Sequence, residues 1–159
     1  MPVARAAELL GSCCGSPRWV EAMVTRRPFH TRSVLLAAAD NVWLSLDPAD
    51  WLEAFSHHPR IGERAASATV SGRAQAWSAG EQSGMSSADD ALRVALAETN
   101  AEYERRFGYL YIVSAAGKSA EQMLELARAR LKNEPGVELA TAAKEQETIM
   151  RIRLERLFA

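Results

Sequence analysis

The stretch SAEQMLELARARLKNEPGVELATAAKEQETIMRIRLERL, residues 119–157, decides the fold class. It opens with Ser119 and, three residues later, Gln122, the capping-box pattern in which each side chain caps a backbone N–H group at a helix start. The letters NEPG at 133–136 end this first helical pattern, and a final helix is predicted from there to the C-terminus. Two helices joined by a short break are typical of an all-α protein.

Three more helix starts can be recognised in the first third of the chain. Ser16 and Pro17 combine a capping residue with a proline at the first helical position, and Asp47 and Pro48 repeat this pair. Thr31 can cap a further helix between them. The chain therefore reads as consecutive helices with short connections.

Two segments interrupt this helical pattern. Residues 62–87 are small and polar, with room for one short helix at 73–78, and a polar segment of this length is either mobile or functional. A longer helix follows, capped by Ser87 and ended by Gly108. Residues 109–113 (YLYIV) favour a strand but have no partner strand, so they are predicted to form a buried extended connector. We expect a single all-α domain over 1–159, with about seven to eight helices and a polar active-site segment.

Composition excludes several classes of function. The net charge of −1 argues against nucleic acid as a partner. No stretch approaches the roughly 20 apolar residues that span a bilayer, and the N-terminus lacks the apolar core of a signal peptide. Cys13 and Cys14 are the only cysteines, and adjacent cysteines rarely meet disulfide geometry. We expect them to be small buried side chains rather than a metal pair, in a cytoplasmic protein.

His58 is the first candidate for chemistry. Pro59 disfavours helical backbone at His58, so a helix should end there, and Gly62 allows a tight turn. An imidazole with an ordinary pKa of about 6.5 suits proton transfer. The alternative is a helix-terminal histidine that bonds a carbonyl group. His57 is expected to point elsewhere, and because no HxH or HxxxH spacing occurs, no zinc site is expected.

Glu81, in the letters WSAGEQSGM at 77–85, is the second candidate. The flanking glycines predict a tight polar loop. Together with Gln82 and Ser78, this carboxylate could present a row of hydrogen-bonding groups to an amide or urea. The alternative is an exposed acidic residue of a loop.

Arg153 is the third candidate, because helical periodicity places it on an apolar face. At 100° per residue it falls between Ile149 and Leu157, whereas Arg151 and Arg156 fall on the solvent side. An inward arginine needs a partner, so it either joins a buried ion pair or binds an anionic substrate through its planar fork.

Several separated motifs together resemble one family. HPRIG at 58–62, WSAGEQSG at 77–84, ETNAEYERRFGYLYIVSAAGKS at 98–119 and residues 129–157 occur in the order found in the OHCU decarboxylase family of urate breakdown, which acts on 2-oxo-4-hydroxy-4-carboxy-5-ureidoimidazoline. The resemblance covers essentially the whole chain. It implies an all-α domain, usually a homodimer, that uses no metal or organic cofactor. It also implies a place after urate oxidase and hydroxyisourate hydrolase, with (S)-allantoin as product.

The resemblance also implies roles for individual residues. His58 and Glu81 match the catalytic histidine and glutamate of the family, and Arg153 matches its binding arginine. The remaining substrate-binding positions are Pro59, Ser78, Gln82, Ile112 and Val113. The competing interpretations are a non-enzymatic helical interaction module and a family member that acts on a related ureide. Convergence of His58, Glu81 and Arg153 on one cleft would favour the enzyme.

Overall fold

Helices make up the regular secondary structure of the part of the chain that the computed structural model describes, which is residues 1–62, 72–81 and 90–158. These residues contain eight helices and no strand, as predicted for an all-α protein. The helices are α1 (Val3–Cys13), α2 (Pro17–Thr25), α3 (Arg32–Ser45), α4 (Pro48–Ser56), α5 (Gly72–Glu81), α6 (Asp90–Phe107), α7 (Ala120–Arg130) and α8 (Pro135–Arg156).

The predicted helix starts are confirmed by their caps. The Ser16 hydroxyl accepts a hydrogen bond from the Trp19 N–H at 3.3 Å, and the Thr31 hydroxyl accepts one from Val34. Asp47 and Ser119 each begin a capping box. The predicted cap at Ser87 lies outside the described residues. Sequence patterns did not predict α1, because it begins after Pro2 with no side-chain cap.

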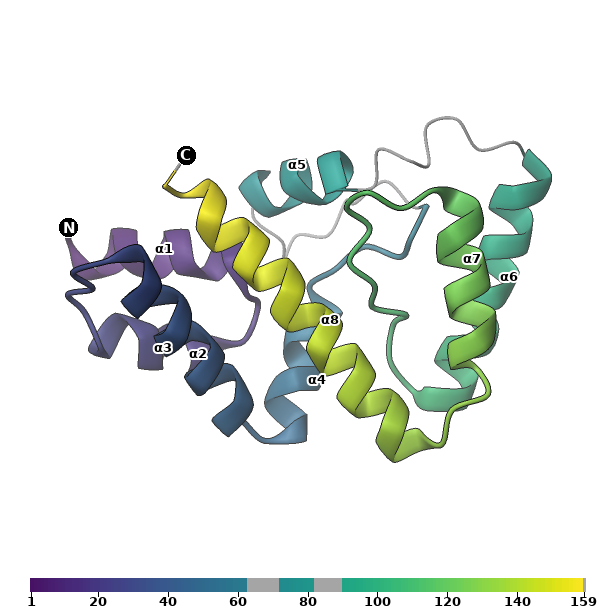
Figure 1. Cartoon of the computed structure of the whole chain (residues 1–159), viewed down its shortest axis with the longest axis horizontal. Coiled ribbons are helices and arrows are strands. Elements are labelled where there is room, and N and C mark those ends of the chain that lie inside the picture. Colours follow the sequence, from purple (N-terminus) through teal and green to yellow (C-terminus); the bar gives the residue numbers. More distant parts are fainter. Residues whose placement is uncertain (63–71, 82–89, 159) are drawn as a thin grey trace.

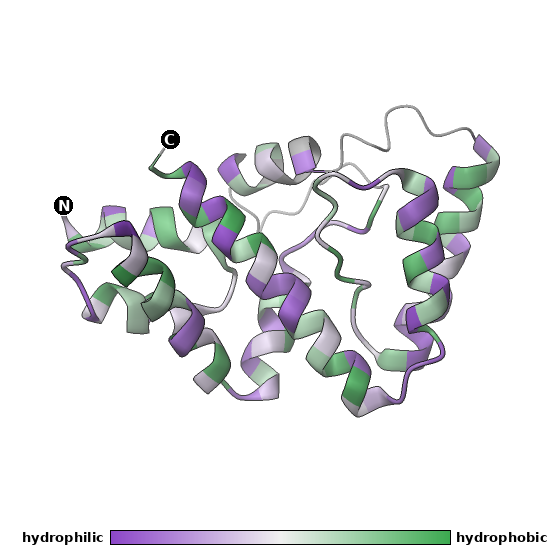
Figure 2. Cartoon of the chain, in the orientation of Figure 1, coloured by the Kyte–Doolittle hydropathy of each residue, from purple (hydrophilic) through white to green (hydrophobic). Residues whose placement is uncertain are grey.

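The long helix α8 lies between two groups of helices. It crosses the molecule diagonally, with α1, α2 and α3 on one side and α6 and α7 on the other (Figure 1). Hydrophilic and hydrophobic residues are interspersed along its whole length (Figure 2), as expected for a helix with both buried and exposed faces. None of the described helices has the length and apolarity that crossing a membrane requires.

Two hydrophobic clusters form the core. The first cluster joins α1–α4 to α8 and contains the large buried side chains Trp19, Trp43, Phe55, Met150 and Leu154. The second cluster joins α6, α7 and the chain around residues 111–115, and it contains Leu96, Tyr103 and Met123. The part of the chain between α4 and α5 also enters this second cluster, through Ile61.

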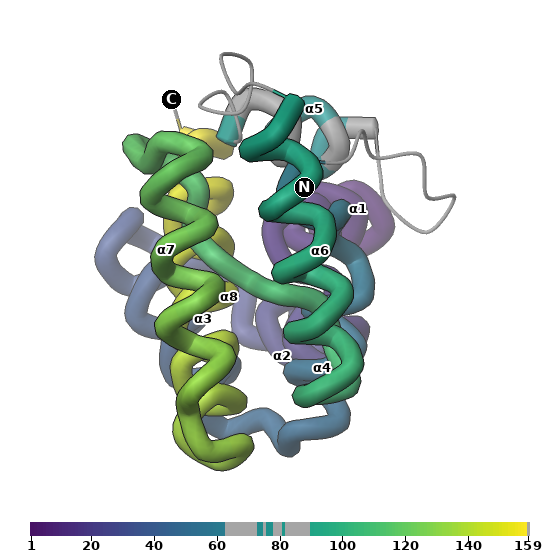
Figure 3. Tube along the Cα trace, turned by 90° about the vertical axis from the view of Figure 1, so that its right-hand side faces the viewer, coloured from purple at the N-terminus to yellow at the C-terminus, as the bar shows by residue number. Residues whose placement is uncertain are grey.

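The extended, mostly buried connector covers residues 109–115, two residues more than the predicted 109–113. Successive side chains of an extended chain point to opposite sides. Tyr111, Val113 and Ala115 accordingly belong to the second cluster, whereas Ile112 belongs to the first. In the rotated view the connector crosses between the α6–α7 pair and α8 (Figure 3).

A buried polar network anchors this connector. Arg130 on α7 donates to the Ile112 carbonyl at 2.6 Å and to the Glu138 carboxylate at 2.7 Å. Tyr103 on α6 donates to the same carboxylate, and Glu138 is fully buried on α8. Because charge and hydrogen bonds are matched, the network fixes α6, α7, α8 and the connector relative to one another.

Candidate active site

His58 lies directly after the C-terminal end of α4. The helix ends at Ser56 with His57 as its C-cap, and the His58 N–H donates to the Phe55 carbonyl at 3.1 Å. Gly62 then adopts a φ of 90°, which favours glycine. The helix therefore ends where the proline predicts it, and His58, a residue of intermediate overall exposure, lies in a constrained turn.

The imidazole of His58 is held by the side chain of Gln146. Its Nε2 lies 2.6 Å from Oε1 of Gln146, which is fully buried on α8. Burial and, to a smaller extent, the positive charge of Arg153 lower the pKa of His58 to about 3, although the hydrogen bond to Gln146 acts in the opposite direction. The ring is therefore neutral at physiological pH and able to accept a proton.

Glu81 is the last residue of α5 rather than part of a loop, so that part of the prediction is wrong. The helix continues through Gly80, which the sequence pattern did not indicate because α5 has no clear apolar stripe. A carboxylate is unfavourable at the C-terminal end of a helix, where the helix dipole is negative. Two arginines offset this: Arg153 binds both carboxylate oxygens at 3.1 Å, and Arg156 binds Oε1 at 3.2 Å.

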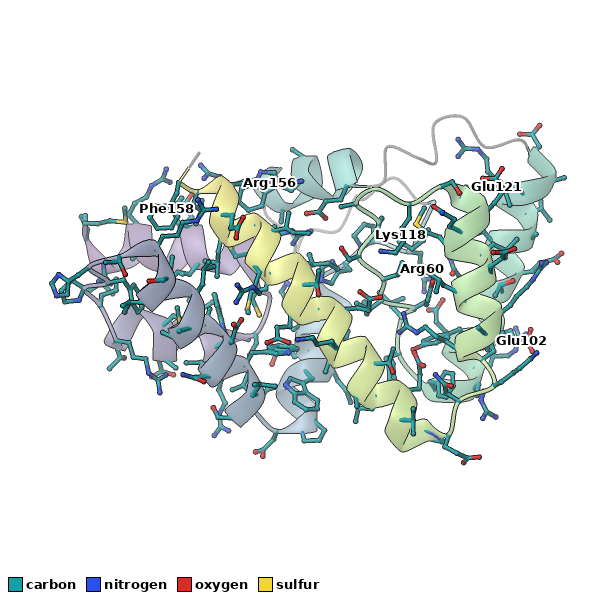
Figure 4. The ribbon with its side chains drawn as sticks, viewed as in Figure 1. Arg60, Glu102, Lys118, Glu121, Arg156 and Phe158 are labelled. Carbon is teal, nitrogen blue, oxygen red and sulfur yellow. The ribbon has the colours of Figure 1, made fainter. Side chains whose placement is uncertain are left out.

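Arg153 points inward, as its periodicity predicts. It is only 4% exposed, and beyond Glu81 its Nη1 approaches the Ser12 carbonyl at 3.5 Å. The two neighbouring arginines differ from it. Arg151 pairs with Asp40 on α3, and Arg156 is exposed but still reaches Glu81 from the end of α8 that lies near α5 (Figure 4).

A small cavity brings most of the predicted site residues together. Its volume is about 20 Å³, and its lining includes His58, Pro59, Glu81, Ile112 and Val113. Arg153 joins this group through its ion pair with Glu81. The side chain of Ser78 and the whole of Gln82 lie outside the described residues. His58 and Glu81 thus share the small cavity, whereas Arg153 lies next to it and does not line it.

His58 also borders a larger cavity. It has a volume of about 740 Å³, within the range of small-molecule sites, and lies between α1 and α2. His58 and Arg153 both line it, as do His57 and Cys14. His57 packs closely on Gly15, since a Cβ added there would lie 2.5 Å from its Cγ. The two adjacent histidines thus have different neighbours.

Comparison with known proteins identifies the family. Residues 1–155 match the family described as OHCU decarboxylase. The chain belongs to the OHCU decarboxylase family. Among solved structures, one of OHCU decarboxylase in the presence of (S)-allantoin is 33% identical, with a TM-score of 0.81 over 93% of this chain and 95% of that chain. One of (S)-allantoin synthase is 20% identical, with a TM-score of 0.73 over 98% of this chain and 50% of that one, and supports the fold alone.

Two further relatives of this OHCU decarboxylase family member are longer proteins. The uric acid degradation bifunctional protein TTL of Arabidopsis thaliana is 33% identical over 147 residues, which are 92% of this chain and 45% of that protein. The uric acid degradation bifunctional protein PucL of Bacillus subtilis (strain 168) is 26% identical over 148 residues, 92% of this chain and 29% of that protein. The chain thus spans less than half of the length of either relative.

Sequence reasoning about this family member missed one residue beside the site. Gln146 lies seven residues before Arg153, so both occupy the same face of α8. The periodicity that selected Arg153 therefore also indicates Gln146, but an uncharged amide is a weaker signal than a buried charge.

Cys13, the last residue of α1, and Cys14, which follows it, are buried free thiols. Burial raises the pKa of both to about 12, so both stay protonated, and the interpretation as small buried side chains is confirmed. Within residues 1–62, 72–81 and 90–158, no group of three or more His, Cys, Asp or Glu side chains is placed to hold a metal ion.

Proposed function

We propose that this protein is a cofactor-independent decarboxylase of urate breakdown. It converts 2-oxo-4-hydroxy-4-carboxy-5-ureidoimidazoline to (S)-allantoin and CO2. The observation that carries this proposal is a small cavity lined by His58 and Glu81, with Arg153 paired to Glu81, in a member of the OHCU decarboxylase family. The similarity to a structure of OHCU decarboxylase in the presence of (S)-allantoin supports the same substrate class.

The substrate itself supplies the electron sink. Its carboxylate is bonded to a ring carbon next to a C=N group, so the electron pair of the breaking C–C bond moves into that group as CO2 leaves. The nitrogen takes up one proton, which balances the charge of the lost carboxylate. The protein's part is then to orient the substrate, exclude water and direct protons.

His58 is the proposed acid–base residue. A neutral imidazole can accept the proton of the substrate's 4-hydroxyl group as that carbon becomes a carbonyl. A proton is then placed on the adjacent ring carbon, which bears the ureido group, and delivery to one face makes the allantoin chiral. His58 and Glu81 are both close enough to this cavity to direct that step.

Glu81 and Arg153 are the proposed binding groups. A carboxylate beside Gln82 can accept hydrogen bonds from the ureido or ring N–H groups, and the guanidinium of Arg153 can hold an anionic or carbonyl oxygen. Because these two side chains pair with each other, substrate binding has to replace part of that ion pair. A cavity of about 20 Å³ admits no more than a water molecule, so the site has to widen for the substrate.

The proposal is tested with freshly made substrate. Urate, urate oxidase and hydroxyisourate hydrolase generate it in the cuvette, and circular dichroism follows the chiral product. We expect this protein to accelerate the appearance of (S)-allantoin, whereas heat-denatured protein leaves only slow formation of racemic product. No acceleration would contradict the proposal. Turnover of another ureide in its place would indicate a changed substrate, and no turnover of any ureide would favour an interaction module.

We further propose that the protein acts as a homodimer in the cytoplasm, directly downstream of urate oxidase and hydroxyisourate hydrolase. The family resemblance supports the homodimer and the place in the pathway, and the two free, buried cysteines support the cytoplasm. Size-exclusion chromatography with light scattering tests the homodimer, since a mass near 17.4 kDa would contradict it.

A further inference from the structure

Gln146 has an unusual position for an amide side chain. It is fully buried on α8, its Oε1 lies 2.6 Å from His58 Nε2, and its own Nε2 has no hydrogen-bond partner. A buried donor without a partner lowers stability, so each such group calls for an explanation. Gln146 contacts His58 but lines neither of the two cavities described above.

We propose that Gln146 is a positioning residue that fixes the tautomer of His58. Its Oε1 accepts the hydrogen bond from Nε2–H, which leaves Nδ1 as the nitrogen that exchanges a proton with the substrate. This inference rests on the proposed function. Within residues 1–62, 72–81 and 90–158, Nδ1 has no hydrogen-bond partner.

The acceptor Oε1 of Gln146 suits an imidazole that gains and loses a proton at its other nitrogen. Nε2 carries a proton both in this neutral tautomer and in the imidazolium ion. The bond to Gln146 is therefore kept while Nδ1 gains and loses a proton, and the ring does not reorient during the reaction. If the amide were turned by 180°, it would donate to Nε2 and place the single proton on Nδ1, which could then not act as a base.

The uncharged state of Gln146 matters as well, because the ring is surrounded by titratable groups. Arg153 on α8 and the neighbouring His57 both oppose a positive charge on the ring. The other titratable groups facing it across the two cavities are Glu81, Tyr111, Cys14, Glu8 and Glu21. A carboxylate in place of the amide would attract a proton to the ring. Gln146 orients the imidazole and leaves it neutral.

The first test needs no turnover. Long-range proton–nitrogen correlation spectra of the full-length protein at pH 7 report which nitrogen of each imidazole carries the proton. The chain has three histidines, so the loss of one set of signals in His58→Asn assigns His58. We expect a neutral ring protonated at Nε2. Protonation at Nδ1, or an imidazolium ion, would overturn the proposal even if the enzyme is active.

The second test uses the pH dependence of kcat/KM. In Gln146→Glu the pH below which kcat/KM falls should rise by about one pH unit or more, since a carboxylate favours the imidazolium form. Ala140→Glu adds the same charge on the exposed side of α8 and should leave the pH dependence of kcat/KM unchanged. Equal shifts in the two variants, or no shift in Gln146→Glu, would overturn the proposal.

The third test separates positioning from a structural role. Gln146→Met keeps the length of the side chain and removes the amide together with its unpaired donor. We expect kcat to fall about 10- to 100-fold, less than for loss of the proton-transferring group itself, with KM within about twofold. The melting temperature should stay within about 3 °C. Full kcat in a less stable protein would overturn the proposal. A wild type that shows the Nε2–H tautomer but no decarboxylation would contradict the proposed function alone.

Discussion

Arg153 on α8 and Glu81 at the end of α5 form a two-pronged ion pair, with Nε–Oε1 and Nη2–Oε2 distances of 3.1 Å. Their side chains are only 5% and 9% exposed. The two groups proposed to bind the substrate thus hold each other in this structure. The sequence left two alternatives for Arg153, a buried ion pair or a substrate contact, and the position of its partner makes the two compatible.

Glu81→Gln should lower both activity and stability. The amide keeps one acceptor but removes the charge that faces a buried guanidinium. We expect kcat/KM to fall by about 100-fold or more. The free energy of unfolding should fall by about 2 to 5 kcal/mol, as when a buried charge pair loses one partner. Urea unfolding and steady-state kinetics measure the two effects. Glu53→Gln, on an exposed position of α4, is the control and should change neither.

Arg153→Lys should impair binding far more than Arg156→Lys. An ammonium group cannot reproduce the planar two-pronged contact, and we expect a loss of about 2 to 4 kcal/mol in transition-state binding. Arg156 makes one contact at 3.2 Å from a side chain that is 36% exposed, so its replacement should change binding by less than about 1 kcal/mol. Melting temperatures with and without (S)-allantoin measure how strongly the ligand protects the wild type and each variant against unfolding. Equal protection of the wild type and both variants would remove Arg153 from the binding site.

His58→Asn should decrease turnover by about 100-fold or more, because no other imidazole borders the small cavity in the described part of the chain. His57→Asn should be far milder, since His57 lines only the larger of the two cavities described above. Formation of (S)-allantoin, followed by circular dichroism, measures both variants. Equal losses would show that the wrong histidine had been assigned.

His58 should also make stability depend on pH. The unfolded chain takes up a proton near pH 6.5, whereas in the folded protein burial lowers the pKa of His58 to about 3. The unfolded state therefore binds more protons between these values, and the free energy of unfolding falls as the pH drops. The slope is at most about 1.4 kcal/mol per pH unit. Urea unfolding between pH 7 and 4 should show a steeper slope in the wild type than in His58→Asn, and identical slopes would contradict a buried neutral ring.

Gly15→Ala should disturb the histidine turn. The added Cβ would lie 2.5 Å from Cγ and 2.7 Å from Cβ of His57, so His57 has to move. We expect a loss of about 1 to 3 kcal/mol in stability and a lower kcat, because His58 is the next residue. Gly11→Ala is the matched control. No atom lies near its added Cβ, and alanine favours the helix, so stability should rise by about 0.5 to 1 kcal/mol. Thermal unfolding with kinetics compares the two variants, and equal stability changes would contradict the close contact.

The helices and the inward arginine could be predicted because local rules govern them. Side-chain caps at Ser16, Thr31 and Ser119 are short-range interactions, and they form as the sequence indicates. The inward position of Arg153 follows from helical periodicity alone. The buried connector could be predicted at 109–113 because the sequence shows no second segment of strand character to pair with it.

Other features depend on contacts between distant parts of the chain. The α5 helix extends to Glu81 although Gly80 weakens helical propensity. The charge of Glu81 at its end is neutralised by Arg153, which lies 72 positions further along the chain. The contact between His58 and Gln146 joins residues 88 positions apart. No local pattern encodes such a pair. The helix α1 was not predicted because it lacks a side-chain cap, and it is held by packing of Leu10 and Cys13 in the first cluster.

The alternation of side chains along the 109–115 connector has a consequence for how this protein can be divided. Ile112 packs with one hydrophobic cluster and Val113 with the other, and both line the cavity beside His58. The turn after α4 makes the same transition, since Phe55 lies in the first cluster and Ile61 in the second. The proposed reaction site therefore lies where the two hydrophobic clusters meet, and neither cluster alone contains all of its residues. A fragment or a graft that carries only one cluster should therefore keep some of these side chains and lack the proposed activity.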